Sequence, residues 1–372
     1  MRGRHPWFYR KMIEKPERPL PAGTAVTVVD RDGKSIGTGF HNPRTELALR
    51  MFAGGPVDDV AAHFVQTLRS ALSLREDTLR LPEVTNGYRV LHAEADGCPG
   101  FILDRLGNAF VAQVSTLGMF LQLEPLGEAL LAQNRDAKLV LLQDADAQKR
   151  EGMERMPPPM PVQVEVQEHG IRYEVTAGGG HKTGFFADQR DNRQLVRTLA
   201  KGRSVLDLCC NSGGFAANAA AGGARSVLAA DLDEAMVAQA RANLKRNKLR
   251  AQVDHGDAFE ILRALRGGEH DLMILDPPKW IANKDQIDAG LPRYRDLNRL
   301  AFEKLARGGI LVTCSCSGAL SEESLLWTLR DAAAMAGRDA RVLSIRGAGP
   351  DHPVALECPE TRYLKVMVLQ VR

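Results

Sequence analysis

The sequence lacks the features that mark membrane and secreted proteins. No stretch approaches the roughly 18 consecutive apolar residues that a membrane-spanning helix needs. Residues 1–7 carry charges but no apolar core, so we expect no secretory signal. The 372 residues are 44% hydrophobic and 26% charged. This length and composition predict a globular, cytoplasmic protein of two or three domains with no membrane partner.

Cysteine is scarce and shows no metal-binding pattern. The six cysteines include one adjacent pair and one Cys-x-Cys. The sequence contains no Cys-x-x-Cys pair and no Cys/His set at zinc spacing. We therefore expect free thiols, as in a reducing compartment, and no metal.

An excess of one charge is also missing, since the net charge is +3. This value does not demand a nucleic acid partner, because nucleic-acid binding depends on a local basic patch. Basic residues cluster within residues 2–15 and within 241–250. A solvated surface explains the second cluster equally well.

The first half of the chain reads as two small β-rich regions. Short alternating stretches between turn residues predict a domain at 1–55 and a β-rich α+β domain at 56–177. A proline-rich linker lies at 156–161. The expected elements are strands at 25–29, 35–40 and 47–52, a helix at 56–74, a hairpin around Gly107-Asn108, a helix at 121–133 and an exposed hairpin around His169-Gly170.

The second half alternates regularly between strands and helices. This pattern predicts an α/β domain at 178–372 with a mostly parallel seven-stranded sheet and helices on both faces. Stretches at 341–345 and 363–369 should add an antiparallel edge. The other expected elements are strands at 204–208, 226–231, 272–276 and 309–313, and helices at 195–199, 215–221, 234–247 and 294–307.

Acids lie at the ends of successive strands of this predicted sheet, where ligands bind in such folds. The first acid opens a glycine turn that allows close backbone approach, at Gly213, Gly214 and Phe215. A single aspartate is more often a turn or cap residue, but four at successive strand ends form a pattern. The four acids are Asp207, Asp231, Asp257 and Asp276.

Two nucleotide-binding motifs are absent. Residues 211–216 do not supply Gly-x-Gly-x-x-Gly, and the glycine-rich stretch 178–183 lacks the glycine that precedes the lysine of a P-loop. With no pyrophosphate to hold, the acids fit a cofactor that is positively charged at its reactive centre. S-adenosylmethionine, which carries a sulfonium, an adenosine and an amino-acid end, meets this description.

Asp276-Pro277-Pro278-Lys279, the acid series and Cys316 together resemble the RlmI family of bacterial 23S rRNA 5-methylcytosine methyltransferases. The similarity covers nearly the whole chain. It implies an N-terminal PUA-like β-barrel that binds RNA, a central β-rich domain and a Rossmann-like class I methyltransferase domain. It also implies 23S rRNA or a large-subunit assembly intermediate as partner. The remaining segments that resemble the family are 4–7, 37–43, 49–50, 88–105, 180–193, 351–353 and 363–365.

The resemblance implies that Cys316 is a nucleophile that adds to carbon 6 of cytosine, and that Asp276 holds the N3 edge of the base. The base must leave any stacked context to enter such a pocket. Cys314 is interpreted as out of phase with Cys316 on the extended strand, and so as a buried filler facing the core. Cys209 and Cys210 are expected to be small core thiols.

Further candidates surround this motif. Trp280, Tyr294 and Asn298 could line a base pocket, although a tryptophan after a strand is as often a packing residue. A second group could contact phosphate or the cofactor carboxylate, or could be surface charges at a helix start. That group is Lys182, Arg190 and Arg193, and Lys279 is a substrate candidate beside the Asp-Pro-Pro motif.

Two other functions remain open at this point. One is a methyltransferase acting on nitrogen, which the Asp-Pro-Pro turn suggests, although Lys279 stands where an aromatic ring would stack on the target amine. The other is a non-catalytic RNA-binding assembly factor with a vestigial cofactor site. A homodimer is one candidate for the oligomeric state.

Overall fold

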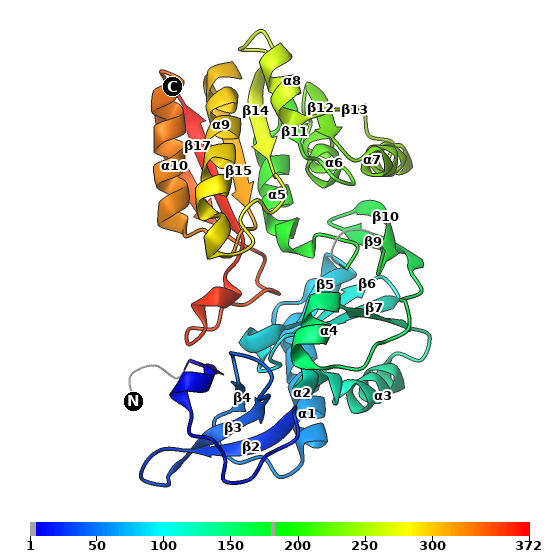
Figure 1. The fold of residues 1–372 in the computed structure, drawn as a ribbon. Helices are drawn as coiled ribbons and strands as arrows, with labels where there is room; N and C mark the ends of the chain where they lie inside the picture. The colour runs from blue at the N-terminus through cyan, green and yellow to red at the C-terminus, as the bar shows by residue number, and fades with distance from the viewer. Residues whose placement is uncertain (1–4, 180–182) are drawn as a thin grey trace. The chain divides into compact units, whose positions relative to one another are not determined.

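The computed structural model describes residues 5–179 and 183–372 of the chain. The chain forms two compact units, which Figure 1 shows coloured along the sequence. No helix among the described residues is long and apolar enough to cross a membrane. The first unit contains Met1–Gly170, Val175–Ala187 and Pro350–Thr361, and the second contains Ile171–Glu174, Asp188–Gly349 and Arg362–Arg372.

The first unit begins with a four-stranded antiparallel sheet in the order β1-β4-β3-β2. The Asp30 carboxylate accepts hydrogen bonds from the N–H groups of Asp32 and Lys34, and Gly33 has a φ of +77°, so a tight turn joins β2 to β3. The predicted strands of this region are confirmed. The strands are β1 (Trp7–Phe8), β2 (Thr24–Val29), β3 (Ser35–His41) and β4 (Leu49–Ala53).

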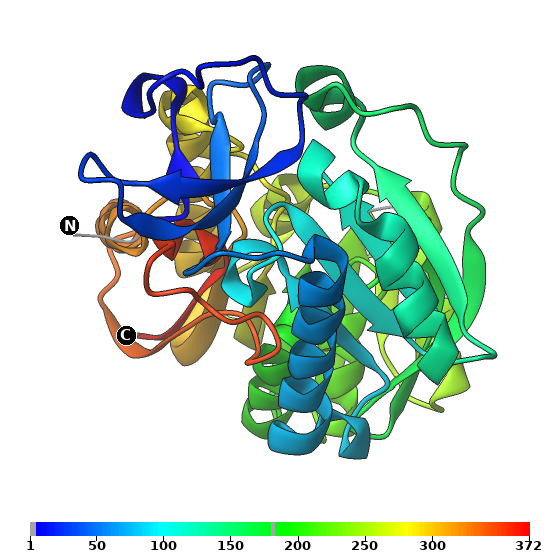
Figure 2. The same ribbon diagram turned by 90° about the horizontal axis from the view of Figure 1, so that it is seen from below.

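A second four-stranded sheet forms the centre of the same unit, in the order β5-β6-β7-β8. β7 and β8 are parallel, and the other pairs are antiparallel. The hairpin at Gly107-Asn108 is confirmed, and α1 and α3 pack side by side on the core of this unit (Figure 2). The elements are α1 (Val60–Ser73), β5 (Gly87–His92), β6 (Phe101–Leu106), β7 (Ala109–Val114), α2 (Leu117–Phe120), α3 (Leu123–Gln133), β8 (Lys138–Gln143) and α4 (Ala145–Glu151).

The hairpin predicted around His169-Gly170 consists of β9 (Val162–Glu168) and β10 (Ile171–Ala177). The prediction that it is exposed is wrong. Every second side chain is buried, as at Val166 and Tyr173, which are both 0% exposed. An alternating pattern indicates a strand with one buried face, and this hairpin has that arrangement.

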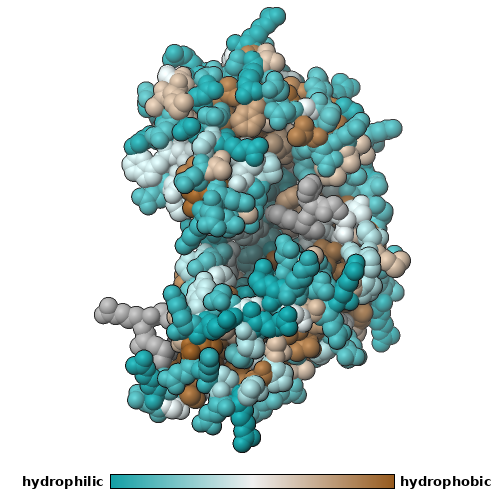
Figure 3. Space-filling view, viewed as in Figure 1, coloured by the Kyte–Doolittle hydropathy of each residue, from teal (hydrophilic) through white to brown (hydrophobic). Residues whose placement is uncertain are grey.

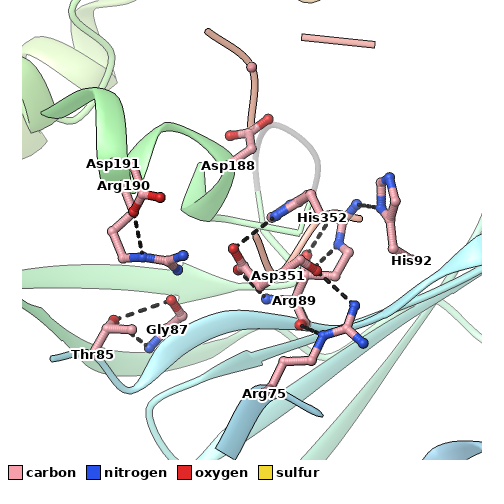
Figure 4. A network of polar contacts seen from close by, with 12 residues as sticks. Arg75, Thr85, Gly87, Arg89, His92, Asp188, Arg190, Asp191, Asp351 and His352 are labelled. Atoms are coloured by element: carbon pink, nitrogen blue, oxygen red, sulfur yellow. Dashed lines mark hydrogen bonds and ion pairs between the residues drawn. The ribbon is translucent and has the colours of Figure 1, made fainter. Parts of the chain in front are cut away.

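A network of buried charges joins elements of the first unit (Figure 4). The Arg75 guanidinium is fully buried and donates to both carboxylate oxygens of Asp96, at 2.6 and 2.8 Å, and to the Asp351 carbonyl at 2.8 Å. Arg89 donates to both oxygens of Asp104 at 2.8 and 3.0 Å. The Arg89 N–H donates to the Asp351 carboxylate at 3.0 Å. Each buried guanidinium therefore has a carboxylate partner.

The second unit contains the predicted seven-stranded sheet, in the order β13-β12-β11-β14-β15-β17-β16. Its pairs are parallel except those that β17 makes with β15 and β16, so the predicted antiparallel edge is confirmed. The strands are β11 (Ser204–Leu208), β12 (Ser226–Asp231), β13 (Gln252–His255), β14 (His270–Leu275), β15 (Leu305–Ser315), β16 (Ala340–Arg346) and β17 (Lys365–Val371).

Helices cover both faces of this sheet, with α5, α6 and α7 in one layer and α8, α9 and α10 in the other (Figure 1). The boundary predicted near residue 294 is wrong, because α9 begins at Ile287 and has Pro292 inside it. Strand β15 begins at Leu305, and α10 was not predicted. The helices are α5 (Arg190–Leu199), α6 (Gly214–Ala221), α7 (Glu234–Arg246), α8 (Ala258–Ala264), α9 (Ile287–Lys304) and α10 (Glu322–Met335).

The face seen in Figure 3 is mainly hydrophilic, with hydrophobic atoms in small scattered groups. The predicted domain boundaries at 55/56 and 177/178 remain predictions.

Candidate active site

The second unit places most of the predicted site residues at one edge of its sheet. Leu208 lies opposite Ala230 of β12 and Leu275 of β14, and Leu275 lies opposite Thr313 of β15. These four strands are parallel, so their carboxyl ends share an edge. Asp231 ends β12, Asp276 follows β14, and Cys316 follows β15.

The turn after β11 has a backbone that few residues adopt. Cys209, Asn211 and Gly213 have φ values of +60°, +48° and +82°. Asparagine and glycine tolerate this region, but cysteine is strained there, and such strain gathers at functional sites. A Cβ on Gly213 would lie 3.0 Å from Cβ of Ala240, which leaves little room for a side chain. Phe215 is buried in the first turn of α6.

Asp207 is a buried acid with spare hydrogen-bonding capacity. It is 0% exposed, and its Oδ2 accepts a hydrogen bond from the N–H of Ala216 at 2.9 Å. Its Oδ1 has no partner among the described residues. Burial raises the pKa of Asp207 well above its usual range, and the charges of Asp276 and Asp231 raise it further. An acid in this state is suited to accept a donor or cation from a ligand.

The carboxylates of Asp231 and Asp257 accept hydrogen bonds from backbone N–H groups. The two carboxylate oxygens of Asp231 accept hydrogen bonds from the N–H groups of Asn211 at 2.8 Å and Asp233 at 2.9 Å. Asp257 caps α8 through the N–H groups of Phe259 and Glu260. Asp231 therefore holds the glycine turn in place, and Asp257 has the capping role that a lone aspartate often has.

Asp276 lies among the titratable groups of the site. Its Oδ2 accepts a hydrogen bond from the Gln189 amide at 3.1 Å. Its negative charge raises the pKa of Asp207 and of Cys314. Gln189 lies in the segment 180–193, and nothing in that segment of the sequence shows that its side chain reaches the end of a strand 87 residues away.

Cys316 lies half-buried in a turn that hydroxyl groups fix on both sides. Ser315 Oγ and Ser317 Oγ each lie 3.0 Å from the Tyr294 hydroxyl. The Ile281 N–H donates to Ser317 Oγ at 3.1 Å. Tyr294 is 0% exposed, and burial raises the pKa of its hydroxyl. The fixed neighbours hold the thiol at the sheet edge that carries Asp276.

The predicted orientation of Cys314 is wrong. Residues two apart on a strand point to the same face, so a spacing of two cannot separate Cys314 from Cys316, and Cys316 itself lies just past the end of β15. Burial, Asp276 and Cys316 raise the pKa of the Cys314 thiol, and the Gln189 side chain lowers it, so these groups of the site lie near Cys314. Its predicted burial is confirmed, since it is 0% exposed. Burial and nearby carboxylates raise its pKa well above the ordinary value, which keeps it a neutral thiol.

The other cysteines are free thiols as expected. Cys210 is buried and Cys209 is half-buried at the glycine turn. Burial and the charges of Asp207 and Asp231 raise the pKa of both thiols, so neither is activated.

The arginines predicted at a helix start are core residues. Arg190 is 1% and Arg193 is 3% exposed, so the interpretation of surface charges does not apply. Arg190 pairs with Asp191 at 3.3 Å, and Arg193 packs close to Gly214, where a Cβ would lie 3.0 Å from its Cδ. Arg193 therefore lies beside the glycine turn. Lys182 lies outside the described residues.

The candidates around the Asp-Pro-Pro motif divide into two groups. Lys279 is exposed and Trp280 is half-buried. The Trp280 ring packs edge-on against Tyr294 at 4.9 Å between centroids, and the Arg293 guanidinium lies 5.3 Å above it. Asn298 is 0% exposed and donates to the Tyr294 carbonyl at 2.8 Å. Tyr294 thus supports the Cys316 turn from the core, Asn298 is buried in the same helix, and Lys279 and Trp280 lie nearer the solvent.

One group of potential metal ligands lies together among the described residues, in the first unit: His5, Cys358 and Glu360. The His5 ring lies 3.1 Å from the Glu360 carboxylate, and the Cys358 thiol lies 3.6 Å from it. These contacts account for the group as a link between the N-terminal segment and Pro350–Thr361.

The site and its sheet define a class I methyltransferase domain. A strained glycine turn after β11, a buried carboxylate oxygen with no partner in the described part of the chain, and acids at neighbouring strand ends fit S-adenosylmethionine, whose sulfonium and ammonium are cationic. Asp207, the turn at Gly213 and Gly214, and Asp231 are the residues that would hold it.

Comparison with known proteins supports this class. A family model for S-adenosylmethionine-dependent methyltransferases matches residues 137–342, and a PUA-like domain model matches residues 1–53. The crystal structure of SMU.776 complexed with SAH covers 99% of this chain and 96% of its own, with a TM-score of 0.82 and 18% identity, which shows the fold.

Two curated relatives extend over nearly the whole chain. The ribosomal RNA large subunit methyltransferase I of Escherichia coli is 33% identical over 379 residues, covering 99% of this chain and 96% of its own. The protein of that name from Vibrio vulnificus is 35% identical over 383 residues, with the same coverage. The chain belongs to the ribosomal RNA large subunit methyltransferase I family of S-adenosylmethionine-dependent methyltransferases.

Proposed function

We propose that the protein transfers a methyl group from S-adenosylmethionine to carbon 5 of a cytosine in 23S rRNA. The observation that carries this proposal is the half-buried Cys316, held by Ser315 and Ser317 at the sheet edge that also carries Asp276 and Asp207. The PUA-like domain and the name of the relatives support an rRNA substrate. A homodimer remains a prediction.

Carbon 5 of cytosine is a poor nucleophile, and Cys316 would overcome this by covalent catalysis. The thiolate adds to carbon 6, so an S–C6 bond forms and the electrons of the C5=C6 bond become available at carbon 5. S-adenosylmethionine supplies an electrophilic methyl group on a sulfonium. A C5–CH₃ bond then forms as the methyl–sulfur bond breaks. The carbon 5 proton leaves to water, C5=C6 re-forms, and the S–C6 bond breaks to release the thiolate.

Asp276 would hold the N3 edge of the base during this addition. Negative charge develops on the ring as the thiolate adds, and a proton that the Asp276 carboxyl group shares with N3 would neutralise it. The Gln189 amide, which donates to Asp276 Oδ2, would orient the carboxyl group. Lys279 and Trp280 lie near the solvent beside the same motif and would contact the RNA.

The test is methyl transfer from labelled cofactor to 23S rRNA, as deproteinised RNA and as large-subunit particles, followed by nucleoside mass spectrometry. We expect 5-methylcytidine as the labelled product. A nucleoside methylated on nitrogen would replace this proposal with the amino methyltransferase. Tight cofactor binding by calorimetry, without transfer to either substrate, would favour the assembly factor.

A further inference from the structure

Lys365 is a buried lysine beside the Cys316 turn. It is the first residue of β17, lies opposite Ser315 of β15, and is 3% exposed. Burying an ammonium group is unfavourable unless the protein provides partners for it. A lysine in this position therefore needs a reason beyond packing.

The hydrogen bonds of Lys365 fix its ammonium next to the turn. Its Nζ donates to the Ser317 carbonyl at 2.5 Å and to the Tyr363 carbonyl at 2.9 Å. An ammonium has three donors, so these two acceptors leave one. Within the described part of the chain, the ammonium forms no ion pair with a carboxylate. Ser317 directly follows Cys316, so the lysine is tied to the backbone that carries the thiol.

Among the charged groups that act on the pKa of Lys365, Cys316 has the largest effect. Burial lowers the pKa of Lys365 to about 8, and the Cys316 thiolate opposes this shift more than any other group. Arg362 and Lys279 lower the pKa further, and Glu322 of α10 raises it. From α9, the Tyr294 hydroxyl also interacts with Cys316. With a pKa of about 8, the lysine is mostly protonated at pH 7.

We propose that Lys365 is a positioning residue that acts through Cys316: its ammonium stabilises the thiolate, and its bond to the Ser317 carbonyl fixes the turn. A nearby cation favours the thiolate form, which is the nucleophile. When the thiol ionises, its proton passes to water, and the negative charge on sulfur lies near enough to the ammonium to raise the pKa of Lys365. This assignment rests on the proposed role of Cys316.

The test measures the thiol without RNA or cofactor. Alkylation of Cys316 by iodoacetamide is followed from pH 6 to 10, with the modified peptide quantified by mass spectrometry. Lys365→Met should move the midpoint of the pH profile upward by about 1 to 2 units, which is about a 10- to 100-fold loss of reactivity at pH 7. The exposed Lys201 provides the control Lys201→Met, which should not move it. An unchanged midpoint in a folded Lys365→Met protein overturns the proposal.

Two further measurements cover a variant that does not fold. Lys365→Arg retains the charge and should keep the midpoint within about half a unit. The thiolate absorbance of the unmodified protein minus that of Cys316→Ala gives the titration of Cys316 without any change at Lys365. A midpoint below the ordinary value of about 8.5 supports the proposal, and a midpoint at or above it contradicts the proposal.

The outcomes separate this proposal from the proposed function. If the midpoint of Cys316 alkylation depends on Lys365 but no 5-methylcytidine forms, the role of Lys365 is supported and the proposed reaction is overturned. Formation of 5-methylcytidine, with an alkylation midpoint that Lys365→Met leaves unchanged, would support the proposed reaction and overturn the role of Lys365.

Discussion

Two groups of buried charges in this molecule are built in opposite ways. In the first unit, Arg75 and Arg89 each meet a carboxylate through two hydrogen bonds, at Asp96 and Asp104. In the second unit, Asp207 keeps one carboxylate oxygen without a partner among the described residues, and Lys365 donates only to carbonyls there.

The difference separates a structural network from a binding site. A paired buried charge is stable but has no capacity left for a ligand. An unpaired one reduces the stability of the folded protein, and this is tolerated where a ligand later supplies the partner. The pKa shifts agree: the pKa of Asp104 is lowered by Arg89, and the pKa of Asp207 is raised by burial.

The largest effect should come from the proposed nucleophile. Cys316→Ala should reduce methyl transfer by at least about 1,000-fold, because the covalent route is lost. The matched control Cys314→Ala removes the neighbouring buried thiol and should leave most activity. Both are measured as single-turnover transfer to 23S rRNA. Equal loss in the two variants would refute the assignment of Cys316.

Breaking the paired network should destabilise the first unit. Arg75→Met leaves Asp96 buried beside no cation, and the free energy of unfolding should fall by about 3–5 kcal/mol in urea titrations. Arg80→Met is the control, because its pair with Glu83 is exposed and contributes about 0.5 kcal/mol or less. A loss below about 1 kcal/mol for Arg75→Met would show that the network is not structural.

Replacing the unpaired acid Asp207 should stabilise the cofactor-free protein, whereas breaking the paired network should destabilise it. Asp207→Asn should weaken cofactor binding by about 10- to 100-fold in calorimetry, through loss of a charged hydrogen bond. The same change should raise the Tm of the cofactor-free protein. Burial raises the pKa of Asp207 in the folded protein above the ordinary 3.8. The stability that this group contributes is therefore fully present below pH 3.8 and is lost as the pH rises from there towards the pKa of the folded protein. The gain in Tm should therefore grow from pH 4 to pH 7; a lower Tm at pH 7 would contradict this account.

The smallest effect concerns the support of the turn. Tyr294→Phe removes the hydroxyl that joins Ser315 and Ser317, and should lower the rate of methyl transfer by about 3- to 10-fold, as expected for one hydrogen bond. Cofactor affinity should not change. A weaker affinity for the cofactor with an unchanged rate of methyl transfer would show that Tyr294 supports the cofactor site and not the Cys316 thiol.

The sheet of the second unit was predictable because its signal is local. Apolar runs that end in an acid or a glycine turn identify β11, β12 and β14 along with Asp207, Asp231 and Asp276. Helix α10 was not predicted, and the phase argument for Cys314 failed on the simple geometry of a strand. Lys365 could not be assigned a role, because its place opposite Ser315 depends on an antiparallel pairing across 50 residues. The burial of Arg190 and Arg193 likewise depends on tertiary packing.

The central claim is that Cys316 forms a covalent bond to carbon 6 of cytosine. It is tested most directly with 23S rRNA that carries 5-fluorocytidine. Fluorine replaces the carbon 5 proton whose loss releases the thiolate, so the adduct is trapped after methyl transfer. Protease digestion and mass spectrometry should place the nucleotide on the peptide that contains Cys316. An adduct on another residue, or methyl transfer to unmodified RNA with no trapped adduct, would contradict the account.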